Sequence, residues 1–277
     1  MTVLVIGASS QIGRFLLPRL DAIGCEWVGL SRAAPADDAR WLRGHVPDAM
    51  PALPPVTAIL SAGPLDHLAT WLATTRLDGR PHIIATSSMS AESKRDSDVP
   101  HERELSRRLR DAETRLATTC ASWGMPWTIF RPTLVYGAGM DRSITPIVQA
   151  AIRRRVFPLP AARGQRQPVH ADDIAAAFVA ALGNARARGK TFPIGGGDRL
   201  SAGEMFRRAR RSMGVATLPA PVPRVALALA AALRPELRGA LQRLDSDLVA
   251  DNAELEAVLG VHPRPFRPEP ATWRTPA

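Results

Sequence analysis

Two glycines six residues apart stand in a turn near the start of the chain, where a phosphate group could bind. The segment from Gly7 to Gly13 lies between a short β-branched run and a helical pattern. Gly7 permits a tight turn, Gly13 lets the helix approach the strand, and the N–H groups at the helix start can face a pyrophosphate. The usual dinucleotide-binding turn has three glycines, and Ser10 replaces the middle one here and offers a hydroxyl to phosphate. The turn predicts a dinucleotide site that includes Gly7, Ser10, Gln11, Ile12 and Gly13.

The residue after the second apolar run distinguishes the two nicotinamide dinucleotides. A carboxylate at this place would hold the ribose hydroxyls of NAD(H), but the chain has Ser31 and Arg32. A carboxylate repels a 2′-phosphate, whereas a guanidinium can bind it in bidentate fashion. The alternative is that Arg32 is only a solvated loop residue. We expect NADP(H) to be preferred over NAD(H).

Alternating strand-like and helix-like segments must position this turn. The sequence predicts helices at 11–23, 65–75 and 102–122, and strands at 2–6, 26–30, 56–61, 82–87 and 127–131, with a short strand near Trp41. Strands that alternate with helices and are bounded by short turns are typical of a parallel sheet covered on both faces. The expected fold class is α/β, a doubly wound Rossmann sheet.

The second half of the chain is less regular. Helices are expected at 144–156, 172–182 and 224–259, a strand at 191–194, a polar loop at 90–100 and a proline-rich linker at 215–223. Ser201 and Glu204 are spaced as in a capping box. Val225–Leu233 is interpreted as a packing helix in preference to a membrane-surface anchor. We expect a dinucleotide-binding core over 1–137 and a smaller, mostly helical substrate lobe over 138–277, interleaved with the core.

Composition narrows the class of protein. The 277 residues carry a net charge of +10, yet only two of the 36 basic residues are lysines, and the arginines are spread along the chain. With 5% aromatic residues, a solvated basic face is favoured over a nucleic-acid partner. No signal peptide, transmembrane segment or metal site is expected. Cys25 and Cys120 lie in apolar segments, which fits burial and a cytoplasmic location. The sequence leaves open whether the chain forms a homodimer.

Four further segments complete a resemblance over about residues 1–200. They are Leu60-Ser61-Ala62-Gly63, Thr86-Ser87-Ser88, Arg131-Pro-Thr-Leu-Val-Tyr-Gly137 and Gln167-Pro-Val-His-Ala-Asp-Asp-Ile-Ala175. With the first turn, they resemble the extended or atypical short-chain dehydrogenase/reductase superfamily, which contains the NAD-dependent epimerase/dehydratases and their NmrA-like relatives.

The resemblance implies a cofactor lying across the carboxyl ends of the strands. It adds Ala62, Gly63, Thr86, Pro132 and Val135 to the expected cofactor contacts. It also makes Ser88 the match to the family's catalytic Ser/Thr. His170 and Asp172 are expected to fasten the lobe to the sheet in preference to catalysing a reaction.

One part of the family pattern is missing. Active members carry a tyrosine, the general acid/base, and a lysine four residues later on the long helix after the fifth strand. Alignment on Ala112-Glu113 puts Leu105 and Leu109 at these places. Tyr136 is the only tyrosine in the chain, and neither lysine has a tyrosine four residues before it. The usual dyad is therefore absent.

Three functions stay open. The favoured one is an NAD(P)-dependent oxidoreductase or epimerase/dehydratase-type enzyme with an altered acid/base, for which Ser88, His101, Arg108 or Tyr136 could serve, or whose substrate moves its own proton. The second is a non-catalytic NADP(H)-binding sensor or assembly protein. The third is a lipid- or membrane-associated protein that uses its basic C-terminal helices. The substrate is expected to be a small molecule that the sequence does not name.

Overall fold

A computed structural model of the chain describes residues 1–233 and 244–275. Its centre is a sheet of seven strands in the order β11-β6-β5-β4-β1-β2-β3, with all neighbours parallel. The order reverses between β1 and β4, which is where doubly wound sheets leave a crevice for ligands. The predicted Rossmann fold is confirmed. The strands are β1 (Thr2–Ile6), β2 (Glu26–Ser31), β3 (Trp41–Arg43), β4 (Ala58–Ser61), β5 (His82–Thr86), β6 (Trp127–Pro132) and β11 (Lys190–Ile194).

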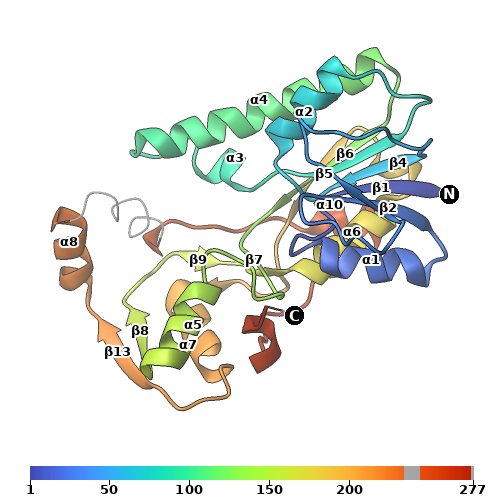
Figure 1. Cartoon of the computed structure of the whole chain (residues 1–277). Coiled ribbons are helices and arrows are strands. Elements are labelled where there is room, and N and C mark those ends of the chain that lie inside the picture. The colour runs from blue at the N-terminus through green and yellow to red at the C-terminus, as the bar shows by residue number, and fades with distance from the viewer. Residues whose placement is uncertain (234–243, 276–277) are drawn as a thin grey trace.

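Successive side chains of a strand point to opposite faces, and β1 is buried on both. Val3 and Val5 belong to a core that includes α1 (Gly13–Ala22) and α6 (Ala171–Ala181). Leu4 and Ile6 belong to a second core that includes α2 (Leu65–Thr74) and α4 (Pro100–Ser122). Figure 1 shows these two pairs of helices on opposite sides of the sheet. The continuous apolar run of β1 therefore follows from its two covered faces.

A third core lies in the lobe, below the sheet in Figure 1, and contains Tyr136, Phe157, Phe206, Phe266 and Trp273. The lobe strands form three pairs: β7 (Val135–Tyr136) with β10 (Val169–His170), β9 (Gln165–Arg166) with β12 (Leu200–Ser201), and β8 (Val156–Pro160) with β13 (Leu218–Val222). Its helical segments are α5 (Thr145–Arg154), α7 (Ala202–Arg211), α8 (Arg224–Leu233) and η2 (Pro270–Trp273). Between these segments the chain returns to the core through α6, η1 (Ala185–Ala187) and β11, and again through α10 (Ala253–Leu259).

Asp172 and Asp173 at the start of α6 tie the C-terminal segment to the core. Asp172 accepts hydrogen bonds from Arg19 of α1 and from Arg264, and Asp173 accepts two more from Arg264. Burial would raise the pKa of Asp172, but the bonds from Arg19 and Arg264 outweigh it and hold that pKa below its usual value. His170 caps α6 and packs edge-on against Tyr136. These contacts match the fastening role expected for His170 and Asp172.

Three stretches differ from the sequence prediction. The loop at 90–100 begins with a short helix, α3 (Ser90–Ser93). The expected linker at 215–223 contains the strand β13. The expected helix at 224–259 is interrupted, because residues 246–252 are not helical, and 234–243 lie outside the described residues. By contrast, Ser201 does cap α7, since its Oγ accepts from Glu204 N at 3.1 Å.

The pair β8 and β13 is built from proline-rich sequences. Leu218 N donates to Arg155 O, and Ala161 N donates to Val222 O. Because the direction of backbone N–H groups alternates along a strand, residues 218, 220 and 222 point theirs at β8, whereas 219 and 221 point away. The prolines of β13 are residues 219 and 221, and those of β8 are residues 158 and 160. The parallel pairing therefore loses no hydrogen bond to proline.

The apolar helix α8 does not pack as expected. Val225 and Leu233 are 80% and 73% exposed, and Leu229 is also exposed, so the interpretation as a packing helix is wrong for these side chains. No helix among residues 1–233 and 244–275 is long and apolar enough to cross a membrane. Figure 1 shows α8 at the end of the lobe, away from the sheet.

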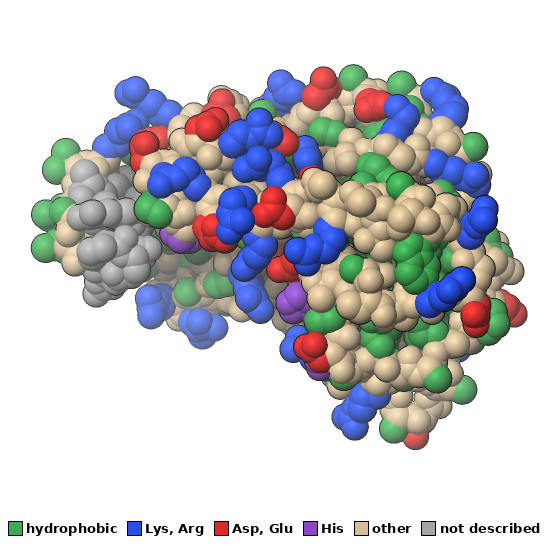
Figure 2. Space-filling model, turned by 90° about the horizontal axis from the view of Figure 1, so that it is seen from above, with side chains coloured by type: hydrophobic (Ala, Val, Ile, Leu, Met, Phe, Trp, Pro, Cys, Tyr) green, Lys and Arg blue, Asp and Glu red, His purple; other side chains and the backbone are tan. Residues whose placement is uncertain are grey.

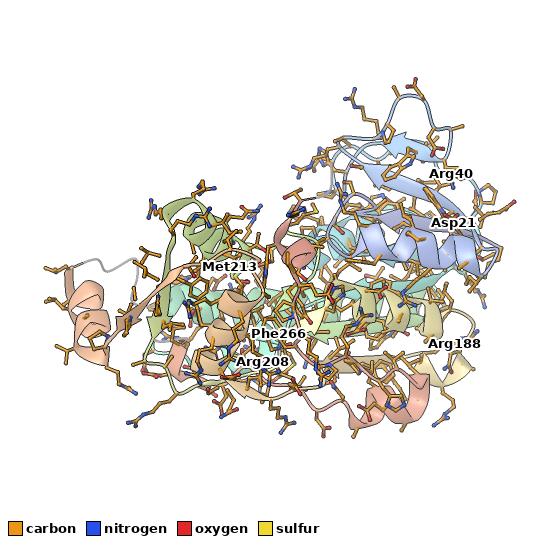
Figure 3. All side chains as sticks on the ribbon, turned by 90° about the horizontal axis from the view of Figure 1, so that it is seen from below. Asp21, Arg40, Arg188, Arg208, Met213 and Phe266 are labelled. Carbon is orange, nitrogen blue, oxygen red and sulfur yellow. The ribbon has the colours of Figure 1, made fainter. Side chains whose placement is uncertain are left out.

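The basic residues do not gather into one patch on the face shown in Figure 2, where they alternate with acidic and uncharged side chains. Many arginines form local ion pairs, as Arg208 does with Asp198 and Glu204. Figure 3 shows Arg208 beside Phe266, whose carbonyl accepts from its Nη1 at 3.1 Å. Cys25 and Cys120 are free and buried, as predicted, and burial raises the pKa of Cys120 to about 12.

Candidate dinucleotide and substrate site

The turn between β1 and α1 is tightly packed at both glycines. Gly7 has a φ of +77°, which favours glycine, and a Cβ there would lie 3.3 Å from the carbonyl carbon of Ala62. At Gly13 a Cβ would lie 2.2 Å from the carbonyl oxygen of Ala8, so only glycine fits. Ser10 Oγ accepts from Gly13 N at 3.2 Å, which leaves its own O–H free to donate. The turn thus holds the start of α1 close to the end of β1.

The other expected cofactor residues also lie at the carboxyl edge of the sheet. Ala62 N donates to Ile6 O, which places the turn after β4 beside the turn after β1. Thr86 at the end of β5 donates from Oγ1 to Ser61 O at 3.4 Å. Pro132 O accepts from Met89 N, so the turns after β5 and β6 are adjacent as well. The residues predicted from separate motifs therefore share one edge; Gly63 directly follows Ala62, and Val135 lies three residues after Pro132.

Three buried polar atoms at this edge have no hydrogen-bond partner among the described residues. They are Gln11 Nε2, Ser61 Oγ and Ser87 Oγ. Buried polar groups in proteins are almost always paired, so unpaired ones call for an explanation such as a bound group. Gln11 follows β1, Ser61 ends β4 and Ser87 follows β5. Their positions fit a polar ligand that lies across the strand ends, as a dinucleotide would.

Two arginines stand at the ends of β2 and β3. Arg32 is exposed directly after Ser31, and Arg43 ends the neighbouring strand. The strands pair in register there, with Ser31 opposite Arg43, and Arg43 Nε donates to Arg32 O at 3.4 Å. Ser9 Oγ lies 2.7 Å from Ser31 Oγ in the adjacent turn. Sequence reasoning found Arg32 but missed Arg43, although the short strand expected near Trp41 pointed to this edge.

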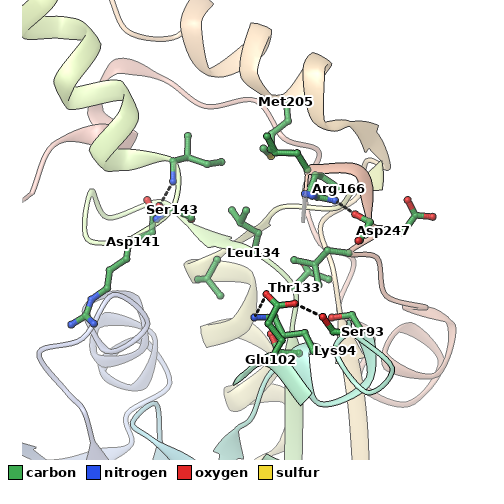
Figure 4. Close-up of a pocket in the computed structure, with 18 of the residues that line it drawn as sticks. Ser93, Lys94, Glu102, Thr133, Leu134, Asp141, Ser143, Arg166, Met205 and Asp247 are labelled. Atoms are coloured by element: carbon green, nitrogen blue, oxygen red, sulfur yellow. Dashed lines mark hydrogen bonds and ion pairs between the residues drawn. The ribbon is translucent and has the colours of Figure 1, made fainter. Parts of the chain in front are cut away.

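A cavity of about 870 Å³ separates the sheet edge from the lobe. Gln11 and the segment from Thr133 to Val135 line it from the core, and Ile144, Met205 and Phe206 line it from the lobe. Figure 4 shows Thr133, Lys94 and Glu102 together on one wall, with Met205 and Arg166 across from them. The volume lies within the usual range for small-molecule sites, about 300–1,000 Å³. The described wall also carries six carboxylates and three cationic side chains.

None of the residues weighed as a replacement acid/base is among the described residues that line this cavity. Tyr136 is 1% exposed between His170 and Phe266, and burial raises its pKa. His101 and Arg108 are exposed on α4. Ser88 Oγ accepts from Ser90 N at 3.1 Å, and Ser88 is not among the described residues that line the cavity.

Leu105 and Leu109, which stand at the places of the family's tyrosine and lysine, are both half-buried on α4. Leu109 lines a smaller hollow of about 160 Å³ with Gly63, Thr86 and Ser87. This hollow therefore lies at the sheet edge where the cofactor residues gather. Neither leucine can transfer a proton.

A charged pair that sequence reasoning missed lies on the cavity wall. Lys94 Nζ is 3.4 Å from Glu102 Oε1, and Ser97 Oγ donates to Glu102 Oε2 at 2.8 Å. The side chains of Lys94 and Glu102 are 15% and 5% exposed. Lys94 comes from the segment expected to be a loop, and Glu102 comes from the first turn of α4. The only sequence signal was that Lys94 is one of two lysines in the chain.

Comparison with known proteins agrees with this architecture. Residues 110–195 match the model of the NAD dependent epimerase/dehydratase family. Among curated proteins, none matches the chain. Solved structures, by contrast, do match the chain. A UDP-glucuronic acid 4-epimerase from Bacillus cereus in complex with NAD is 14% identical, with a TM-score of 0.70, and the alignment covers 99% of this chain and 98% of that one.

Two other solved structures are similar over nearly the whole chain. A UDP-glucose 4-epimerase from Thermotoga maritima, with UDP-glucose, is 14% identical, with a TM-score of 0.69 and coverage of 99% and 98%. A short-chain dehydrogenase/reductase superfamily protein from Agrobacterium tumefaciens, with bound NAD, is 12% identical, with a TM-score of 0.67 and coverage of 99% and 95%. The chain therefore shares the fold of these solved structures, and its residues 110–195 match the NAD dependent epimerase/dehydratase family, in agreement with the sequence resemblance.

Proposed function

We propose that the protein is a nicotinamide-dependent enzyme of the epimerase/dehydratase or reductase type, with NADP(H) preferred over NAD(H). The observation that carries the proposal is the position of Gln11. Its Nε2 is buried without a partner among the described residues, within the turn that fits a pyrophosphate, and the residue also lines the 870 Å³ cavity. A cofactor held at the turn would thus reach the substrate cavity.

The residues have distinct roles in this proposal. The backbone from Gly7 to Gly13 holds the pyrophosphate at the start of α1, where the helix dipole favours negative charge. Ala62, Gly63, Thr86 and the segment 132–135 line the path of the cofactor toward the cavity. When bound, the nicotinamide supplies or accepts a hydride. Ser88 contributes a polar contact to a substrate oxygen, as its match in the family implies.

The preference for NADP(H) is supported by Arg32 and Arg43. Two guanidinium groups at the ends of adjacent strands, with Ser9 and Ser31 beside them, suit a phosphate monoester. A ribose with free hydroxyls would gain little from them. Two of the solved structures named above contain NAD, so the preference is a property proposed for this chain alone.

The cavity suits a substrate about the size of a sugar nucleotide. The two epimerases named above act on UDP-sugars, and UDP-glucose and UDP-glucuronic acid are therefore the first substrates to test. The described wall holds more carboxylates than cations. Uncharged carbonyl compounds, which such a wall repels less than a diphosphate, form the second group to test.

The test of cofactor choice is a fluorescence titration with NADPH and NADH. Arg32→Glu removes charge-assisted bonds of about 1.5–3 kcal/mol and adds repulsion, so NADPH affinity should fall roughly 10- to 150-fold or more. NADH affinity should change little. Arg115→Glu, on the exposed face of α4, is the matched control. Tighter binding of NADH than of NADPH to the unmodified protein would refute the preference.

A non-catalytic NADP(H) sensor is the second candidate, because the chain has no tyrosine four residues before a lysine. The two functions differ in one measurement, the oxidation of bound NADPH by UDP-sugars and by a panel of aldehydes and ketones. Turnover supports the enzyme. Tight NADPH binding without turnover of any of these compounds supports the sensor.

A further inference from the structure

The cavity wall contains an ammonium and a carboxylate, and the carboxylate lies on α4, the helix from which the family's tyrosine and lysine are missing. Glu102 lies on α4 three residues before Leu105, so the two occupy the same side of the helix one turn apart. Lys94 follows α3, with its Nζ 3.4 Å from Glu102 Oε1. Both residues line the cavity together with Thr133. Thr133 lies between Pro132 and Val135, two of the expected cofactor contacts.

The surroundings of Glu102 keep this pair in place. Ser97 Oγ donates to Glu102 Oε2 at 2.8 Å, and Ser97 Oγ also accepts from Val99 N at 3.2 Å. Ser106, one turn further along α4, donates to Ala91 O at 2.6 Å and fixes α3 against α4. A carboxylate in the first turn of a helix is also favoured by the helix dipole. The pair is therefore held from both helices, and its attraction must offset the desolvation penalty of two shielded charges.

We propose that Lys94 is the proton donor and acceptor of this site, in the place of the missing tyrosine, and that Glu102 is the residue that positions it. The inference rests on the proposed nicotinamide-dependent function. When a substrate carbonyl carbon accepts a hydride from the reduced nicotinamide, the π electrons of the C=O bond move to its oxygen. This oxygen takes one proton from the Lys94 ammonium, which becomes a neutral amine and regains a proton from water. In the reverse direction the amine takes the hydroxyl proton as the hydride leaves carbon.

The first test uses the two redox states of the cofactor as probes and needs no substrate. NADP⁺ carries one more positive charge on its ring than NADPH, so a nearby ammonium disfavours NADP⁺ and a nearby carboxylate favours it. For a charge about 6 Å from the ring, the ratio of the two affinities changes roughly 3- to 100-fold as the effective dielectric constant falls from about 80 to about 20.

Lys94→Met should therefore tighten NADP⁺ binding relative to NADPH, and Glu102→Gln should weaken it. The double variant, which removes both charges, should return the ratio close to that of the unmodified protein and guards against effects of misfolding. Lys190→Met and Glu104→Gln are the controls, because Lys190 pairs with Glu254 and Glu104 with Arg107, both on the surface. If the pair had only a structural role, either substitution would weaken the binding of NADP⁺ and of NADPH equally.

A second test exploits the small number of lysines. An amine-selective reagent followed by mass spectrometry reports on Lys94 and Lys190 in the same sample. Saturating NADPH should protect Lys94 at least severalfold and leave Lys190, 40% exposed, unchanged. The inference would be overturned if Lys94→Met and Glu102→Gln did not change the ratio of NADP⁺ to NADPH affinity in opposite directions. It would also be overturned if NADPH left the labelling of Lys94 unchanged. Absence of any NADP⁺ or NADPH binding to the unmodified protein would instead overturn the proposed function.

In any turnover with NADPH, the loss of a proton donor costs about 10²–10⁴ in rate. Lys94→Met should show this loss in kcat and Lys190→Met should not. Glu102→Asp, which keeps the carboxylate, should restore part of the rate that Glu102→Gln loses. Full turnover by Lys94→Met would also overturn the assignment of Lys94 as the donor.

Discussion

Replacement of Gly13 by alanine tests whether the first turn must be packed as the structure shows. The added Cβ would lie 2.2 Å from the carbonyl oxygen of Ala8 and 2.6 Å from both the carbonyl carbon of Ala8 and the carbonyl oxygen of Gly7. All three are backbone atoms, which cannot move aside by rotating a side chain. Overpacking of this kind costs about 1–3 kcal/mol or more. Alanine in a helix recovers only about 0.5–1 kcal/mol.

We therefore expect Gly13→Ala to lower the free energy of unfolding by about 2 kcal/mol, or Tm by roughly 4–8 °C for a chain of this size. Gly203→Ala is a matched control, because Gly203 also lies in the first turn of a helix, α7. Its added Cβ would meet nothing nearer than Arg207 Nη1 at 3.5 Å. This control should be stabilised by about 0.5–1 kcal/mol.

The assays are urea unfolding of both variants and NADPH titration of the folded proteins. Since the clash would displace the backbone between Gly7 and Ser10, Gly13→Ala should also weaken NADPH binding at least tenfold, whereas Gly203→Ala should leave it unchanged. The reasoning is refuted if Gly13→Ala matches the unmodified protein in both stability and NADPH affinity, because the close approach of α1 to β1 would then have no consequence.

Three further predictions concern pH, catalysis and the lobe. Burial and the nearby Arg188 lower the pKa of His82 to about 4. Between about pH 6.5 and 4 the unfolded chain therefore binds a proton at His82 that the folded protein does not. As the pH decreases through this window, the free energy of unfolding should fall by up to about 1.4 kcal/mol per pH unit. Urea unfolding of His82→Gln should show a shallower dependence, and an equal slope would contradict this. If the protein is an enzyme, Ser88→Ala should lower turnover strongly and Tyr136→Phe should matter less; robust carbonyl reduction by Ser88→Ala would disprove the role of Ser88. Limited proteolysis should not release a stable, folded fragment 140–277, because β11 and α6 belong to the core.

The parts of the fold that the sequence predicted well are those in which local pattern and burial agree. The run Thr2–Ile6 reads as a strand and is one, because a strand covered on both faces needs apolar residues at every position. By contrast, β13 was missed because prolines normally argue against a strand. The alternation that makes Pro219 and Pro221 acceptable depends on which side the partner strand lies, and a single sequence does not contain that information.

The same limit applies to the site. Residues that follow a strand closely in the sequence, such as Gly7, Gly13 and Arg32, were placed from their position relative to the strands. Lys94 and Glu102 were not, because Lys94 follows α3 and Glu102 lies on α4, and the contact between these two helices depends on tertiary packing. Sequence could not distinguish Ser87 from the expected Ser88, because the difference is that Ser88 Oγ accepts a hydrogen bond from Ser90 N whereas Ser87 Oγ has no partner among the described residues.

The prolines of β8 and β13 have a consequence for how the molecule meets others of its kind. A two-stranded ribbon exposes two outer edges, and free N–H groups along such edges can recruit another strand. Here the outward-pointing positions 158, 160, 219 and 221 are prolines, so neither edge offers a donor at these places. The exposed apolar side chains of Val156 and Leu218 on this ribbon would otherwise favour stacking. The ribbon is therefore protected against edge-to-edge aggregation by the same residues that hide it from sequence-based prediction.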